Sequence, residues 1–130
     1  MRAVDTSVIV PALLQWHDAH EDCRYLLEGA MVPSQALLES YSVLTRMPGG
    51  VDSRLASEVV LERLAPLEMA QTSSMGETIR RLVGAGVSGG AVYDGLIGLT
   101  AAAGGCRLLT RDRRAARTYE ALGVDYELLV

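Results

Sequence analysis

Acidic residues in four separate stretches of the sequence interrupt patterns that are otherwise apolar. Asp5 follows a short apolar start in "RAVDTSVIV", and Asp112 follows "LLTR". Glu39 lies within "PSQALLESYSVLTR", and Asp94 is the only charged residue between positions 92 and 103. Burying a carboxylate without a partner costs considerable free energy. Each of these acids therefore needs a cation or strong hydrogen-bond donors.

Each acid also has an ordinary structural explanation. Asp5 and Asp112 can cap the helices that follow them, because an aspartate side chain accepts hydrogen bonds from the free N–H groups of a first helical turn. Asp94 sits where the positive end of a helix favours negative charge, although its helix is apolar nearly all round and is expected to be buried. Glu39 occupies an otherwise apolar helical stripe and can reach water from its edge.

Together the four acids indicate a cation site. Carboxylates that meet in one place repel one another or hold protons unless positive charge lies among them. Mg²⁺ and Mn²⁺ prefer oxygen ligands, whereas zinc would favour histidine or cysteine, which do not accompany the set. Such metals activate water and stabilise the leaving oxygen in phosphodiester hydrolysis. Hydroxyl groups beside the acids are candidate accessory residues: Thr6, Ser7 and Thr110.

Short apolar stretches alternate with longer helical patterns along the chain. The predicted strands span residues 2–5, 30–32, 67–70, 107–110 and 126–130. Thr6 or Ser7, Asp18 and Ser34 are predicted to start the first three of about seven helices. This alternation predicts one α/β domain over residues 1–130, with a central parallel five-stranded sheet between helices. Because parallel strands end along one edge, Asp5 and Asp112 are expected at the edge where such folds bind ligands.

Composition narrows the possible functions. The 130 residues are 49% hydrophobic and 22% charged, as in an ordinary globular domain. No apolar run is long enough for a membrane span and no secretory signal is convincing, so a cytoplasmic protein without membrane contact is expected. All 12 basic residues are arginine, which excludes P-loop and Schiff-base chemistry because both need a lysine. Cys23 and Cys106 are expected to be free thiols.

Several basic and aromatic residues are weaker candidates. Four arginines are candidates for contacts with phosphate groups. Three of them flank Asp112, namely Arg111, Arg113 and Arg114, and the fourth, Arg46, lies in the same predicted helix as Glu39. A solvated helix face explains these arginines equally well. His17 and His20 are better explained as surface helix residues than as a metal-binding pair. Packing is also the commoner role for Trp16 and the tyrosines.

In order and spacing, these stretches resemble the motifs of the PIN-domain ribonucleases, and among them the VapC-type toxins of bacterial toxin–antitoxin pairs. The matching motifs are "VDTSVIV", "LLESYSVLTR", "AVYDGLIGLTAAAGG" and "LLTRDRR". The resemblance implies a Mg²⁺- or Mn²⁺-dependent endoribonuclease with Asp5, Glu39, Asp94 and Asp112 as catalytic and metal-binding residues. It also implies a homodimer, a cognate VapB-like antitoxin, and transfer or ribosomal RNA as the substrate, so that cleavage inhibits translation.

Other functions remain open at this stage. The sequence is also compatible with a PIN nuclease that processes RNA without an antitoxin, or with a binding module that has the PIN fold but no nuclease activity. Retention of all four acids argues against the binding module. Outside this family, a phosphotransfer receiver would need a lysine, and a haloacid-dehalogenase-like phosphatase would need a second aspartate at the position of Ser7.

Overall fold

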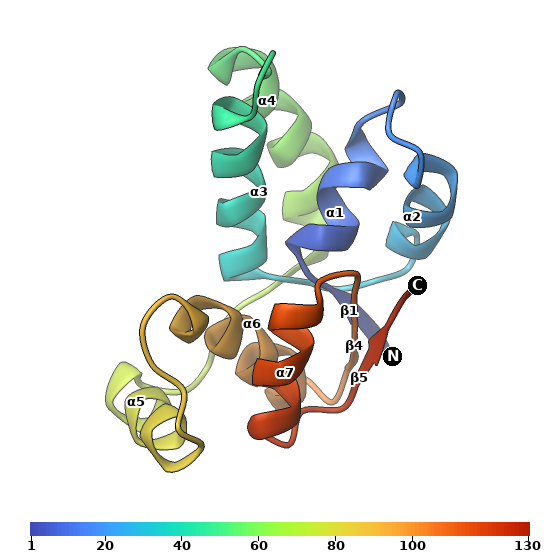
Figure 1. Cartoon of the computed structure of the whole chain (residues 1–130). Coiled ribbons are helices and arrows are strands. Elements are labelled where there is room, and N and C mark those ends of the chain that lie inside the picture. The colour runs from blue at the N-terminus through green and yellow to red at the C-terminus, as the bar shows by residue number, and fades with distance from the viewer.

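The computed structural model describes all of residues 1–130, and its strands and helices follow one another along the chain as shown in Figure 1. The strands are β1 (Arg2–Val4), β2 (Val32–Pro33), β3 (Glu68–Met69), β4 (Arg107–Thr110) and β5 (Tyr126–Leu128). The helices are α1 (Thr6–Leu13), α2 (His20–Leu27), α3 (Ser34–Arg46), α4 (Ser53–Val59), α5 (Met75–Gly84), α6 (Ala91–Ala103) and α7 (Arg113–Ala121). The predicted α/β alternation is therefore present.

The strands are all parallel, but they do not form the single regular five-stranded sheet that the sequence predicts. One sheet has the order β1-β4-β5, and a second, smaller sheet pairs β2 with β3. The two sheets are linked by an isolated parallel bridge between Ala3 and Met31. β2 is only two residues long and ends at Pro33, which has no N–H to donate, so the pairing stops there.

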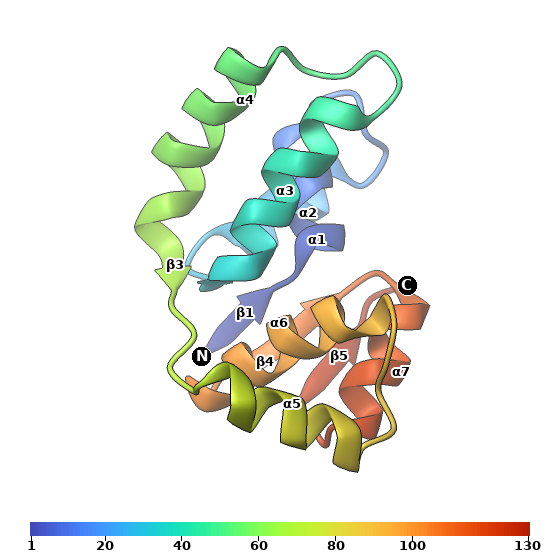
Figure 2. The same ribbon diagram turned by 90° about the vertical axis from the view of Figure 1, so that its left-hand side faces the viewer.

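The helices cover the two sides of the strands. In the view of Figure 2, α1 to α4 occupy the upper half of the molecule, whereas α5, α6 and α7 lie in the lower half with β4 and β5. The central strands are accordingly apolar on both faces: Ala3, Val4 and Leu108 are fully buried. This arrangement leaves the carboxyl ends of β1 and β4 at one edge of the sheet, next to the starts of α1 and α7.

Some helix starts differ from the sequence-based prediction. α1 is capped by Asp5, whose side chain accepts from the Ser7 N–H, and not by Thr6 or Ser7. α2 begins at His20 without a side-chain cap, so Asp18 does not have the predicted role. Asp112 caps α7, as its ordinary structural explanation predicts. α4 is followed directly by a short π-helix (Val60–Leu64) and a 3₁₀ turn (Ala65–Leu67).

Helix α6 packs closely against its neighbours through glycines. A Cβ at Gly95 would lie 2.6 Å from Leu82 Cδ2 on α5, and a Cβ at Gly98 would lie 2.8 Å from Tyr119 Cδ1 on α7. The opposite side of α6 is not buried, contrary to the prediction from its apolar sequence: Tyr93 is 69% exposed. No helix is both long enough and apolar enough to span a bilayer.

Candidate active site

The four acids that interrupt the apolar pattern all line one pocket of about 410 Å³, called the acid pocket below. They come from four elements: Asp5 from the end of β1, Glu39 from α3, Asp94 from α6 and Asp112 from the turn before α7. The rest of the lining consists of Thr6, Ser7, Val10, Pro11, Val43 and Arg111. The structure thus brings together residues that are more than 100 positions apart, at the carboxyl edge of the parallel strands.

Asp5 is the most deeply buried of the acids, with 3% of its surface exposed. Its Oδ1 accepts from the Ser7 N–H at 3.0 Å and from Ser7 Oγ at 2.5 Å, and its Oδ2 accepts from the Tyr119 hydroxyl at 2.8 Å. Burial raises the pKa of Asp5 above its usual value, whereas these hydrogen bonds lower it. Asp5 therefore serves as a helix cap and also presents a fixed carboxyl group to the pocket.

Tyr119 is a site residue that the sequence reasoning missed. It is completely buried on α7, and burial followed by the charge of Asp5 raises the pKa of its hydroxyl, so the hydroxyl stays protonated and donates to Asp5. A signal was present in the sequence, since Tyr119 follows Asp112 by seven residues. Seven residues are close to two helical turns, so Tyr119 lies about two turns along α7 from the N-cap residue Asp112.

Glu39 and Asp94 are less buried than Asp5. Thr6 Oγ1 donates to Glu39 Oε1 at 2.5 Å, which joins the start of α1 to α3 across the pocket. The pKa of Asp94 is raised to about 6, chiefly by burial and then by the negative charges of Glu39, Asp112 and Asp5. These acids are therefore close enough to repel one another, and no basic residue offsets that repulsion.

A short hydrogen-bond network holds the remaining polar groups of the acid pocket. Ser7 Oγ lies 3.3 Å from Thr110 Oγ1 and accepts from the Arg111 N–H at 2.7 Å. Thr110 Oγ1 in turn accepts from the Asp112 N–H at 3.1 Å. The expected accessory hydroxyls therefore fix the backbone between β4 and α7. Asp112 Oδ1 accepts from the N–H groups of Arg114 and Ala115, so its cap role and its place in the pocket coexist.

The candidate phosphate-binding arginines are not all placed alike. Arg111 lines the acid pocket, whereas Arg46, Arg113 and Arg114 are exposed and do not line it. No arginine forms an ion pair with Asp5, Glu39, Asp94 or Asp112, since every ion pair in the protein involves other acids. The pocket therefore keeps its excess of negative charge.

The chemistry of the acid pocket fits a hydrated divalent cation. Its acidic donors are all carboxylate oxygens, and burial followed by repulsion from the other acids raises the pKa of Asp94. No three acidic, histidine or cysteine side chains converge closely enough to hold an ion together. Mg²⁺ does not require such a cluster, because it retains several waters and is bound through one or two carboxylates.

Other sequence candidates lie outside the acid pocket and have structural roles. His17 Nδ1 accepts from the Ala19 N–H, and His20 Nδ1 lies 3.0 Å from the Pro11 carbonyl oxygen. These contacts hold the turn before α2 and do not form a metal-binding pair. Cys23 and Cys106 are free and buried, as expected.

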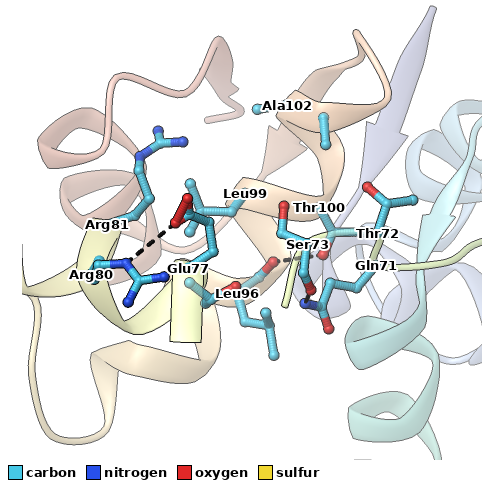
Figure 3. A pocket seen from close by; sticks show the side chains of 12 residues that line it. Gln71, Thr72, Ser73, Glu77, Arg80, Arg81, Leu96, Leu99, Thr100 and Ala102 are labelled. Atoms are coloured by element: carbon cyan, nitrogen blue, oxygen red, sulfur yellow. Dashed lines mark hydrogen bonds and ion pairs between the residues drawn. The ribbon is translucent and has the colours of Figure 1, made fainter. Parts of the chain in front are cut away.

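A second pocket, called the α5–α6 pocket, has a different character. It is about 430 Å³ in volume and lies between α5, α6 and the segment before α5. Figure 3 shows its polar side chains, in which Glu77 Oε2 faces Arg80 Nε at 3.4 Å and Thr100 reaches toward the segment that carries Gln71. Its single acid is paired with Arg80, and Arg81 also lines the pocket, so the α5–α6 pocket contains no unpaired carboxylate.

Comparison with known proteins places the chain in a family. The model of the PIN domain family matches residues 2–121. Ribonuclease VapC40 of Mycobacterium tuberculosis is 42% identical over 99% of this chain and 99% of its own length. Ribonuclease VapC27 of the same organism is 41% identical over 94% of this chain and 92% of its own length.

Solved structures support the same fold at lower identity. FitAB bound to a DNA fragment superimposes with a TM-score of 0.71 and 17% identity, covering 98% of this chain and 94% of that chain. VapBC2 from Rickettsia felis, bound to a fragment of its promoter DNA, gives a TM-score of 0.66 and 18% identity over 99% of this chain and 98% of that chain. The chain therefore belongs to the PIN domain family, and the resemblance to VapC-type members that its four acidic motifs indicate is confirmed.

Proposed function

We propose that the protein is a VapC-type endoribonuclease that hydrolyses RNA phosphodiester bonds at the acid pocket with Mg²⁺ or Mn²⁺. The observation that carries this proposal is the convergence of four carboxylates on one pocket with no basic residue paired to any of them. The relatives named ribonucleases, which match nearly the whole chain, support the same activity.

The proposed mechanism assigns distinct roles to the acids. Asp5 and Asp94, with Glu39 and Asp112, hold the cation, which when bound supplies an activated water and charge stabilisation for the leaving oxygen. Asp5 is oriented by Tyr119 and Ser7, which donate to its two carboxyl oxygens. Asp94 must lose its proton before it can bind a cation. Because its pKa is raised to about 6, this requirement makes activity fall below that pH.

We further propose the cellular role of a toxin, with a VapB-like antitoxin as partner and transfer or ribosomal RNA as the cytoplasmic substrate. The relatives named VapC and the solved FitAB and VapBC2 assemblies support such a partnership. A homodimer formed by the single domain of residues 1–130 is part of the proposal. The surface that supports it is an exposed apolar stripe on α5, formed by Met75, Ile79 and Val83.

RNA cleavage by the purified protein tests the catalytic proposal. Total RNA is incubated with Mg²⁺, with Mn²⁺ and with a chelator, and the products are compared with those of Asp94→Asn. Cleavage is expected only with metal and only with the unsubstituted protein. Cleavage that persists at full rate in the chelator would contradict the metal requirement, and full activity of Asp94→Asn would remove that residue from the site.

Expression in a bacterial host separates the toxin from an RNA-processing nuclease. The toxin proposal predicts growth arrest that is relieved when the neighbouring gene is expressed together with this one. A processing nuclease would cut RNA in vitro but leave growth unchanged. Sedimentation of the purified protein at several concentrations measures whether it is a dimer.

A further inference from the structure

A third cavity adjoins the acid pocket on the side of α2. It is about 470 Å³ in volume and lies between α2 and the chain at and after β5. Its wall is mostly apolar and includes Ala19, Cys23, Leu26, Leu128 and Leu129. We call it the α2–β5 cavity. In Figure 1 the C-terminal end of the chain lies below α2.

Arg111 lies between the acid pocket and the α2–β5 cavity, because it lines both of them. Its backbone is fixed by the bond from its N–H to Ser7 Oγ at 2.7 Å. Its side chain is exposed and has no carboxylate within 4.0 Å, so the guanidinium is free to bind a ligand. Arg111 and Cys23 line the same cavity, where burial raises the pKa of the Cys23 thiol and the positive charge of Arg111 lowers it.

The chemistry of the α2–β5 cavity favours a flat, uncharged group. Tyr25 lines it with a side chain that is 69% exposed, so one face of the ring is available for stacking. Asp22 and Glu127 also line the cavity and would repel a phosphate, but their oxygens can accept hydrogen bonds from ring or amino N–H groups. An apolar floor, an aromatic ring and acceptor oxygens together suit a nucleobase.

We propose that the α2–β5 cavity binds one nucleobase of the RNA strand, next to the phosphate that is cut in the acid pocket. Arg111 lies between the two and contacts the phosphate that joins them, while Tyr25 stacks on the base. This inference rests on the proposed ribonuclease function and adds to it a subsite for sequence preference. Cleavage is then expected to depend on the base at one position beside the scissile bond.

A cycle of substitutions in protein and RNA tests the subsite. The substrate is an RNA oligonucleotide cut at one bond, prepared intact and with single abasic positions on either side of that bond. The protein variants are Tyr25→Ala, which removes the stacking face, and Ala19→Leu, which fills the cavity. Trp16→Ala is the control, because Trp16 is equally exposed at 70% but lies in a different pocket against α2.

The expected result is a fall in kcat/KM of about 10-fold for Tyr25→Ala on intact RNA, the size expected for one stacked base. The abasic substitution at one position should cause a similar fall, and combining the two should cause no further loss. Trp16→Ala should change kcat/KM by less than about 2-fold. Thermal unfolding of each variant checks that the fold is retained.

Three outcomes would overturn the subsite. In the first, Tyr25→Ala and Ala19→Leu cut every RNA as well as the unsubstituted protein does. In the second, their losses multiply with those of every abasic position. In the third, the variants weaken binding of the VapB-like antitoxin but not RNA cleavage, which would make the cavity a protein-docking site.

Binding measured without cleavage separates this inference from the proposed function. Asp94→Asn is titrated into a fluorescently labelled form of the same oligonucleotide, with and without Tyr25→Ala. Weaker binding of the double variant supports the subsite even if no RNA is cut, whereas equal binding contradicts it. Failure of the unsubstituted protein to cut any RNA contradicts the ribonuclease proposal instead.

Discussion

The acid pocket and the α5–α6 pocket have nearly the same volume, about 410 and 430 Å³, but opposite electrostatic designs. In the α5–α6 pocket the carboxylate of Glu77 faces the guanidinium of Arg80. In the acid pocket Asp5 and Glu39 accept hydrogen bonds from hydroxyl or backbone groups, and no acid forms an ion pair, although Arg111 lines the same pocket. Volume therefore does not distinguish the two pockets, whereas the presence of unpaired carboxylates does.

The two pockets also differ in how their charged groups affect the stability of the folded state. An exposed ion pair such as that of Glu77 and Arg80 is close to neutral in free energy. Burial of Asp94, followed by repulsion from the other acids, raises its pKa, so the ionised form of this residue destabilises the folded state. Carboxyl groups with perturbed pKa values cluster at functional sites, because a bound ligand of opposite charge offsets the destabilisation that they cause.

The largest expected effect is on catalysis at the acid pocket. Asp94→Asn keeps the shape of the side chain but removes its charge, so we expect RNA cleavage to fall by at least about 100-fold. Initial rates on one labelled oligonucleotide measure the loss. Glu77→Gln is the matched control in the α5–α6 pocket and should retain the full rate. If both variants lost activity equally, the contrast between the two pockets would be lost.

A smaller effect is expected when the support of Asp5 is removed. Tyr119→Phe deletes the hydroxyl that donates to Asp5 Oδ2, and we expect the free energy of unfolding to fall by about 1.5–3 kcal/mol, as for a hydrogen bond to a charged group. Urea denaturation measures the change. Tyr93→Phe is the control, because Tyr93 is 69% exposed, and it should leave stability unchanged.

The third effect is a dependence of stability on pH. Because the pKa of Asp94 rises from 3.8 to about 6 on folding, the folded chain binds more protons than the unfolded chain between these values. Stability should therefore fall as pH increases from about 4 to about 6, by about 1–2 kcal/mol once the partial exposure of the side chain is allowed for.

Denaturation at several pH values in a chelator measures this dependence. The Asp94→Asn protein should lack this component of the pH dependence. Millimolar Mg²⁺ should also reverse much of it for the unsubstituted protein, because a bound cation favours the ionised carboxyl group. An unchanged pH dependence in the Asp94→Asn protein would contradict the assignment of this effect to Asp94.

The smallest effect is expected in the α5–α6 pocket. Arg80→Ala breaks the ion pair with Glu77, but both side chains are largely exposed, so the free energy of unfolding should change by no more than about 0.5 kcal/mol. Thermal unfolding at low and high salt measures it. A loss of several kcal/mol would mean that this pocket also depends on its charges.

Local sequence was sufficient to predict much of this architecture. The residue range of β4 and the cap of α7 by Asp112 agree with the structure, because a short apolar stretch and an aspartate before a helix are local signals. The rule that parallel strands share a carboxyl edge was enough to place Asp5 and Asp112 together.

What the sequence did not predict depends on contacts between distant residues. The bond from Tyr119 to Asp5 joins positions 114 apart, and the seven-residue spacing from Asp112 alone does not distinguish this tyrosine from one that merely packs. The division of the strands into two sheets depends on how briefly β2 pairs before Pro33. The exposed side of α6 depends on which helices cover it, and its apolar composition gives no indication of this.

The close approach of α6 and α7 at Gly98 has a consequence for how the site tolerates change. A single methyl group at this position would meet the ring of Tyr119, whose hydroxyl holds Asp5. The added methyl group would displace Tyr119 and thereby the carboxylate of Asp5, although the methyl group itself would lie in the protein interior and outside the acid pocket. Position 98 is therefore expected to tolerate no side chain larger than that of glycine without a shift of Tyr119.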